Sequence, residues 1–202
     1  MSAKTGQGKM FYGWWVVIGG FFLMATCYTP FVNCMALFQT HLVGDLNITM
    51  TQYTTGLSLC TVMAVFSSLA IGKLVDKMSV RILGTFTVVV TFVSLLLLSA
   101  ITQLWQFYAL CVLAGLVVVA GTRMLVSVII TNWFTLRRGL AVAIALTGSG
   151  AGGVVLTQVT KVMIAGYGWR PAFQLLAVIA LVCSLPFVIG VFRNHPSQKG
   201  LE

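Results

Sequence analysis

The stretch "GKLVDKMSVR" (residues 72–81) gathers charge in a chain that otherwise carries very little of it. Of the 202 residues, 59% are hydrophobic and only 7% are charged, yet Lys73, Asp76, Lys77 and Arg81 fall within these ten positions. Long apolar runs lie on both sides of the stretch. This pattern predicts a short polar loop that joins two membrane-crossing segments.

Apolar runs of this kind recur along the whole chain, whose mean hydropathy is +1.02. Each is long enough, or nearly so, to cross a hydrocarbon core as a helix, and lipid leaves the backbone of an open strand unsatisfied. The sequence therefore predicts an all-α polytopic membrane protein with six transmembrane helices, surrounded by the lipid bilayer. We expect a tail at 1–10, a six-helix bundle at 11–193 and a terminal segment at 194–202. The predicted spans are 14–39, 50–71, 82–101, 105–132, 139–163 and 171–192.

The basic residues between the apolar runs predict the orientation. Nine Lys and Arg residues fall on the side that holds both termini, whereas Lys161 and Arg170 fall on the other side, with His41 and Asp45 in a loop there. Loops rich in Lys and Arg stay in the cytoplasm. We therefore expect an integral protein of the cell membrane with both its N-terminus and its C-terminus in the cytoplasm.

Other functional classes find little support in the sequence. The net charge of +9 lies in the gaps between apolar runs, so it does not form the basic face of a nucleic-acid-binding protein. The five cysteines lie inside apolar runs without metal-ligand spacing, so we expect no metal and no cofactor. Ser149 in "TGSG" could suggest a serine nucleophile, but no histidine base is expected within the membrane, so we expect no enzyme activity.

Residues 72–81 resemble the signature loop of the major facilitator superfamily, G-x-L-x-D-R/K-x-G-x-R/K. Gly72, Asp76, Lys77 and Arg81 match it, and Ser79 replaces its second glycine. "FYGWWVV" (11–17), "NWFTLRRGLAVAIALTGSGAGGVV" (132–155) and "GYGWRPAF" (166–173) resemble the monocarboxylate and oxalate/formate branches of that superfamily, in the same order along the chain.

The resemblance implies the N-terminal half of a twelve-helix transporter that works by alternating access between two six-helix halves. It implies that Gly72, Asp76, Lys77 and Arg81 form a gating loop, with Asp76 contacting the missing C-terminal six-helix half. Residues 194–202 would then begin the central cytoplasmic linker. The function that it implies is secondary active transport of a small organic anion. Two alternatives stay open: half of an efflux transporter for drugs or other solutes, and a membrane assembly module that does not transport.

Arg123 is the foremost candidate for substrate binding. It lies ten residues before Trp133 and therefore about 15 Å into the membrane, where a charged side chain usually faces water or a partner. A guanidinium can hold a carboxylate through two hydrogen bonds. The alternative is a structural arginine that bonds to backbone carbonyls or to an acid in the missing half.

A polar stripe on the first helix provides further candidates. Thr26, Thr29, Asn33 and Thr40 are spaced so that they share one helix face, beside Pro30. By the resemblance this helix lines the central cavity, so we predict that Thr26, Thr29 and Asn33 bind substrate with Arg123, together with Gln158 of the fifth helix. Ordinary hydrogen bonds between helices would explain these residues equally well. The glycines at 148, 150, 152 and 153 predict close helix packing.

Overall fold

The computed structural model describes residues 12–77, 79–134 and 138–190, and within these ranges the chain is helical with short connections. The first rod runs without a break from Tyr12 to Asp45 through α1 (Tyr12–Leu23), two π-helical segments and α2 (Met35–Asp45). The rods that follow are α3 (Met50–Lys77), α4 (Val80–Ser99), α5 to α6 (Leu104–Trp133), α7 (Arg138–Tyr167) and α8 (Trp169–Gly190). Helices thus occupy the predicted apolar segments, as far as the described residues extend.

Five of these helices are long and apolar enough to cross a membrane. They are Gly13–Asp45, Val80–Ser99, Leu104–Trp133, Arg138–Tyr167 and Trp169–Gly190. The other long helix, α3, has 28 residues and would span about 42 Å. Polar side chains such as Thr51, Gln52 and Thr54 lower the hydropathy of its first half. The sixth crossing therefore stays a prediction.

The first rod ends later than the sequence pattern predicts. His41 and Asp45, expected in a loop, lie inside α2. The helix stops at Asn47, which adopts a left-handed conformation with φ 50°. The amide of Ile48 then donates to the carbonyl of Val43 at 3.2 Å, a helix-ending arrangement that satisfies a terminal carbonyl. Hydrogen bonding of the backbone, rather than the edge of the apolar run, therefore sets this boundary.

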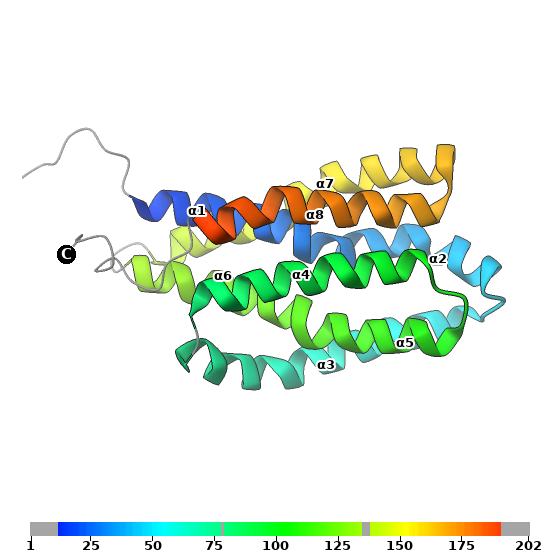
Figure 1. The fold of residues 1–202 in the computed structure, drawn as a ribbon, viewed down its shortest axis with the longest axis horizontal. Helices are drawn as coiled ribbons and strands as arrows, with labels where there is room; N and C mark the ends of the chain where they lie inside the picture. Colours follow the sequence, from blue (N-terminus) through cyan, green and yellow to red (C-terminus); the bar gives the residue numbers. More distant parts are fainter. Residues whose placement is uncertain (1–11, 78, 135–137, 191–202) are drawn as a thin grey trace, which may run out of the picture.

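The rods pack side by side into an elongated bundle (Figure 1). α1 packs along α7, α4 packs along α8, and α3 crosses the central part of the α5–α6 rod. α1 begins and α8 ends at the same end of the bundle (Figure 1), which is the arrangement that an even number of crossings requires. The described end of α3 and the start of α4, which flank the charged 72–81 stretch, lie at this end too.

Glycines set the distance between α7 and the first rod. A Cβ atom at Gly148 would collide with the carbonyl oxygen of Phe21, and one at Gly152 would lie 2.5 Å from that of Ala25. Only a residue without a side chain lets the two backbones approach so closely. The predicted role of the glycine cluster in close packing is confirmed for these two positions. Gly150, on the same helix, has open space around its Cα.

We expect Gly152→Ala to destabilise the bundle by about 1–3 kcal/mol, because the added methyl group must push two backbones apart. Gly150→Ala is the matched control. It should leave stability unchanged or raise it, because alanine favours helix and nothing lies within 4 Å. Thermal unfolding of both variants in detergent, followed by circular dichroism, measures the difference. Equal unfolding temperatures would contradict the packing role.

Candidate functional site

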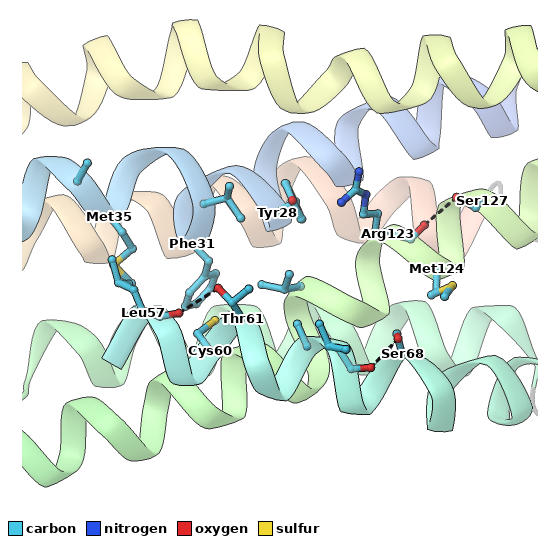
Figure 2. Close-up of a pocket in the computed structure, with 15 residues that line it drawn as sticks. Tyr28, Phe31, Met35, Leu57, Cys60, Thr61, Ser68, Arg123, Met124 and Ser127 are labelled. Atoms are coloured by element: carbon cyan, nitrogen blue, oxygen red, sulfur yellow. Dashed lines mark hydrogen bonds between the residues drawn. The ribbon is translucent and has the colours of Figure 1, made fainter. Parts of the chain in front are cut away.

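A cavity of about 720 Å³ opens between the first rod, α3 and the α5–α6 rod (Figure 2). Its walls combine apolar, aromatic and sulfur-containing side chains with a few hydroxyl groups and one guanidinium. The lining residues are Tyr28, Phe31, Val32, Met35 and Ala36 of the first rod; Leu57, Cys60, Thr61, Ala64, Val65 and Ser68 of α3; and Val119, Arg123, Met124 and Ser127 of the α5–α6 rod. The volume is in the range of small-molecule binding sites.

Irregular backbone borders this cavity on two sides. The first rod is π-helical over Met24–Tyr28 and again over Pro30–Cys34, and the α5–α6 rod is π-helical over Ala114–Val119. Pro30 has no amide hydrogen, which interrupts regular hydrogen bonding in its helix. π-helical turns are frequent at functional sites because they rotate the side chains that follow them. Arg123 comes four residues after the third of these segments.

Arg123 is the charged residue among those that line the cavity. Its side chain is exposed, and Figure 2 shows it reaching from α6 toward the first rod. No described residue hydrogen-bonds to the guanidinium. Asp45 is the acid whose side chain the structure describes. Its carboxylate accepts a 2.7 Å hydrogen bond from the indole of Trp169, at the end of the bundle where the first rod stops and α8 begins. Within the described part of the chain, the guanidinium therefore has no anionic partner.

Two of the predicted site residues lie between helices rather than in the cavity wall. Thr26 is buried, with its hydroxyl bonded to the Phe22 carbonyl and to the Ser184 hydroxyl of α8. Thr29 is fully buried, and its hydroxyl lies 3.2 Å from the carbonyls of Met24 and Ser149. In this conformation both hydroxyls bind helices to one another, which is the alternative that the polar stripe left open.

Asn33 and Gln158 lie on exposed faces outside the cavity. The Asn33 amide donates to the Ser149 carbonyl of α7 at 3.1 Å, so it fastens the first rod to α7 while staying exposed. Gln158 is exposed on α7, about two and a half turns further along that helix than Ser149 is. The structure does not bring these two residues to Arg123, and their contact with substrate stays a prediction.

The predicted gating loop lies at the junction of α3 and α4. Gly72 lies within α3 with open space around its Cα, and Arg81 is half-buried in the first turn of α4. Asp76 and Lys77 belong to the last turn of α3, but their side chains lie outside the described residues. The gating role of these four residues stays a prediction.

Sequence reasoning missed Tyr28 and the small hydroxyl residues of α3 and α6 that line the cavity. Tyr28 belongs to the same rod as the predicted threonines but lies on another face. Regular helical spacing already places Tyr28 on a different face from the threonines, so the missing information was which face of the rod lines the cavity. One signal was available: Pro30 predicts an interruption of the helix at this depth.

Comparison with known proteins agrees with this architecture. The family model described as Major Facilitator Superfamily matches residues 12–202. The chain is 28% identical over 186 residues to the MFS-type transporter hasB of Aspergillus fumigatus, covering 86% of this chain and 41% of that protein. It is 33% identical over 178 residues to monocarboxylate transporter 12-B of Danio rerio, covering 84% and 36% respectively. It is also 27% identical over 204 residues to human monocarboxylate transporter 12, covering 93% and 38%. The chain therefore spans about two fifths of the length of these relatives.

We expect a cysteine at position 123 to react with a membrane-impermeant methanethiosulfonate, because the cavity exposes that side chain to water. Leu125→Cys is the matched control, since Leu125 lies two residues further on and is fully buried. Mass spectrometry of the labelled peptides from protein in nanodiscs measures both, with the unmodified chain as the baseline for the native cysteines. Equal protection of positions 123 and 125 would show that no watery route reaches this arginine.

Proposed function

Because this chain belongs to the Major Facilitator Superfamily, a family of transporters rather than enzymes, we propose that it forms the N-terminal half of a secondary active transporter for a small organic carboxylate. Its similarity to monocarboxylate transporters supports the carboxylate part of this proposal. In this proposal, substrate binds in the cavity between the first rod, α3 and α6. Transport follows when the two halves rock around the bound substrate.

The observation that carries the proposal is the exposed guanidinium of Arg123 in the cavity wall, which has no hydrogen-bond or ionic partner among the described residues. A charged group within a membrane bundle is costly, so it usually serves an ion or substrate pathway. A carboxylate would supply the missing negative charge, and the planar guanidinium can hold both of its oxygens. Among the described residues, no acid competes for this position.

The proposal includes a second six-helix half, which would pack against this chain and contact its charged loop at 72–81. The matched relatives are more than twice as long as the aligned part of this chain. α3 presents Val65, Phe66 and Leu69 on its exposed face, and α7 presents Val154 and Val162. Apolar faces of this kind suit either lipid or partner helices. We propose that the missing half covers part of them and that Asp76 contacts it to hold one gate.

The remaining residues have supporting roles in this proposal. Thr26 and Thr29 hold the first rod against α8 and α7, and thereby fix the wall from which Tyr28 projects. Asn33 and Gln158 lie on exposed faces that a second half could complete into a substrate path. We further propose six crossings in the cell membrane with both termini in the cytoplasm, because the basic residues gather on the side of the termini.

In the full transporter that joins this chain to its second half, we expect Arg123→Gln to lower kcat/KM for carboxylate uptake by about 10- to 100-fold, because hydrogen bonds to charged groups are worth about 1.5–3 kcal/mol. Arg123→Lys should retain part of the activity, since it keeps the charge but not the paired hydrogen bonds. Uptake into proteoliposomes measures both variants.

Arg170→Gln is the matched control for that experiment. Arg170 is also exposed, but it stacks over the Trp169 ring at 4.8 Å at the other end of the bundle. Its loss should leave uptake unchanged. Carboxylate uptake that does not depend on Arg123 would refute its assignment, and transport restricted to neutral or cationic solutes would favour the efflux alternative.

We expect the 202-residue chain by itself to bind substrate without transporting it, because alternating access requires two halves. Proteoliposomes that contain only this chain should show no uptake above empty vesicles. Addition of the second half, expressed as a separate chain, should restore uptake. Saturable uptake by the isolated chain would contradict the half-transporter assignment, and failure of the combined halves to transport would favour an assembly module.

A further inference from the structure

The guanidinium of Arg123 lies away from the end of the cavity that Met35 and Leu57 line, and this separation limits which molecules the cavity can bind. Figure 2 shows Met35 and Leu57 toward one end, Tyr28 near the middle with Arg123 beside it, and Ser127 and Met124 toward the other end. Met35 follows Tyr28 by seven residues on the same rod, which corresponds to about 10 Å along a helix. A bound molecule would therefore meet two different environments along its length.

Three hydroxyl groups in the cavity wall already donate their hydrogen to backbone carbonyls of their own helices. The Thr61 hydroxyl donates to the Leu57 carbonyl at 3.1 Å, and the Ser68 hydroxyl donates to the Val65 carbonyl at 2.7 Å. The Ser127 hydroxyl likewise donates to the Arg123 carbonyl at 3.0 Å. A hydroxyl has one hydrogen to donate, so these three groups face a ligand chiefly as acceptors. Acceptors do not attract a carboxylate.

Tyr28 is the exception among the hydroxyl groups of the wall. It is half-buried, and within the described ranges its phenol makes no hydrogen bond. It lines the same cavity as Arg123, whose guanidinium is also unpaired among the described residues. These two side chains are thus the strong donors that the wall offers to an anion. Both lie near the π-helical segments that interrupt their rods.

The apolar end offers an anion nothing. Phe31, Met35 and Leu57 present carbon and sulfur atoms there. A second carboxylate placed against them would lose its hydration without a partner, which is costly. A short acid held by Arg123 would leave this wall in contact with water and forgo its favourable burial. An aromatic or branched hydrocarbon body would fill it.

We infer that the cavity selects monocarboxylates with a bulky apolar body, with the carboxylate held by Arg123 and the Tyr28 hydroxyl together and the body seated against Phe31, Met35 and Leu57. This inference rests on the proposed carboxylate function and narrows it. It assigns Tyr28 as a second binding residue and excludes dicarboxylates and short hydrophilic acids as preferred substrates.

The test compares four probes on the 202-residue chain in nanodiscs by equilibrium binding: phenylacetate, acetate, oxalate and 2-phenylethanol. We expect phenylacetate to bind at least about tenfold more tightly than acetate, because burial of a phenyl ring contributes about 1.5–3 kcal/mol. Oxalate should bind weakly because its second charge has no partner. 2-Phenylethanol should bind weakly because it lacks the negative charge, and Arg123→Gln should affect phenylacetate but not 2-phenylethanol.

Tyr28→Phe tests the second donor. It should weaken phenylacetate binding about tenfold, since a hydrogen bond to a charged group is lost, and should leave 2-phenylethanol binding unchanged. Tyr167→Phe is the matched control, because Tyr167 is exposed at the end of α7 and does not line the cavity. An unchanged thermal unfolding temperature identifies the effect of Tyr28→Phe as one on binding. Equal phenylacetate binding by wild type and Tyr28→Phe would overturn the role of Tyr28.

The outcomes separate this inference from the proposed function. If phenylacetate, acetate and oxalate bind equally well and all depend on Arg123, the selectivity inference is refuted while the carboxylate function stands. If no carboxylate binds, or if binding does not respond to Arg123→Gln, the proposed function fails and the selectivity inference fails with it. Preference for phenylacetate with dependence on both Arg123 and Tyr28 supports both.

Discussion

Hydrocarbon offers no hydrogen bond to a peptide group, and the rest of this structure depends on that constraint. It requires helices throughout the apolar segments, and it requires a partner wherever a helix departs from regular geometry. Near the π-helical segments, side chains from neighbouring rods supply such partners. The Ser67 hydroxyl of α3 donates to the Leu116 carbonyl in the α5–α6 rod, and the phenol of Tyr53 donates to the Met35 carbonyl at 2.8 Å, just after the second π-helical segment.

These cross-helix bonds and the glycine contacts fix the rods around the cavity. Gly148 and Gly152 let α7 pack closely against the first rod, and Gly115 lets the α5–α6 rod approach the Cys60 carbonyl of α3. The cavity lies where the first rod, α3 and α6 do not close upon one another. Tight packing on one side of each rod therefore accompanies an open, partly polar surface on the other. That division suits the proposed function, in which a tightly packed body carries a wall that faces substrate.

The proposed function depends on the position that the fold gives to Arg123 in the cavity wall. Among the described residues that line the cavity, the guanidinium of Arg123 is the charged group, and in the proposal the rest of the wall determines what accompanies a bound anion. Most hydroxyls in the cavity wall already donate their hydrogen within their own helices, so they have no hydrogen left to donate to an anion. The proposed selectivity follows from this unequal distribution of donors rather than from the number of polar residues.

The sequence by itself determined the helical class, the positions of the apolar segments and the family, and it singled out Arg123 as a candidate, because hydropathy and charge at a given depth depend on composition and spacing alone. Only the tertiary structure decided which neighbours share the cavity. Helical spacing places Tyr28 on a different face from Thr26 and Thr29, but only the packing of the rods decides that the threonines meet α8 and α7 while Tyr28 lines the cavity. The end of the first rod at Asn47 was likewise set by backbone hydrogen bonds that hydropathy does not record.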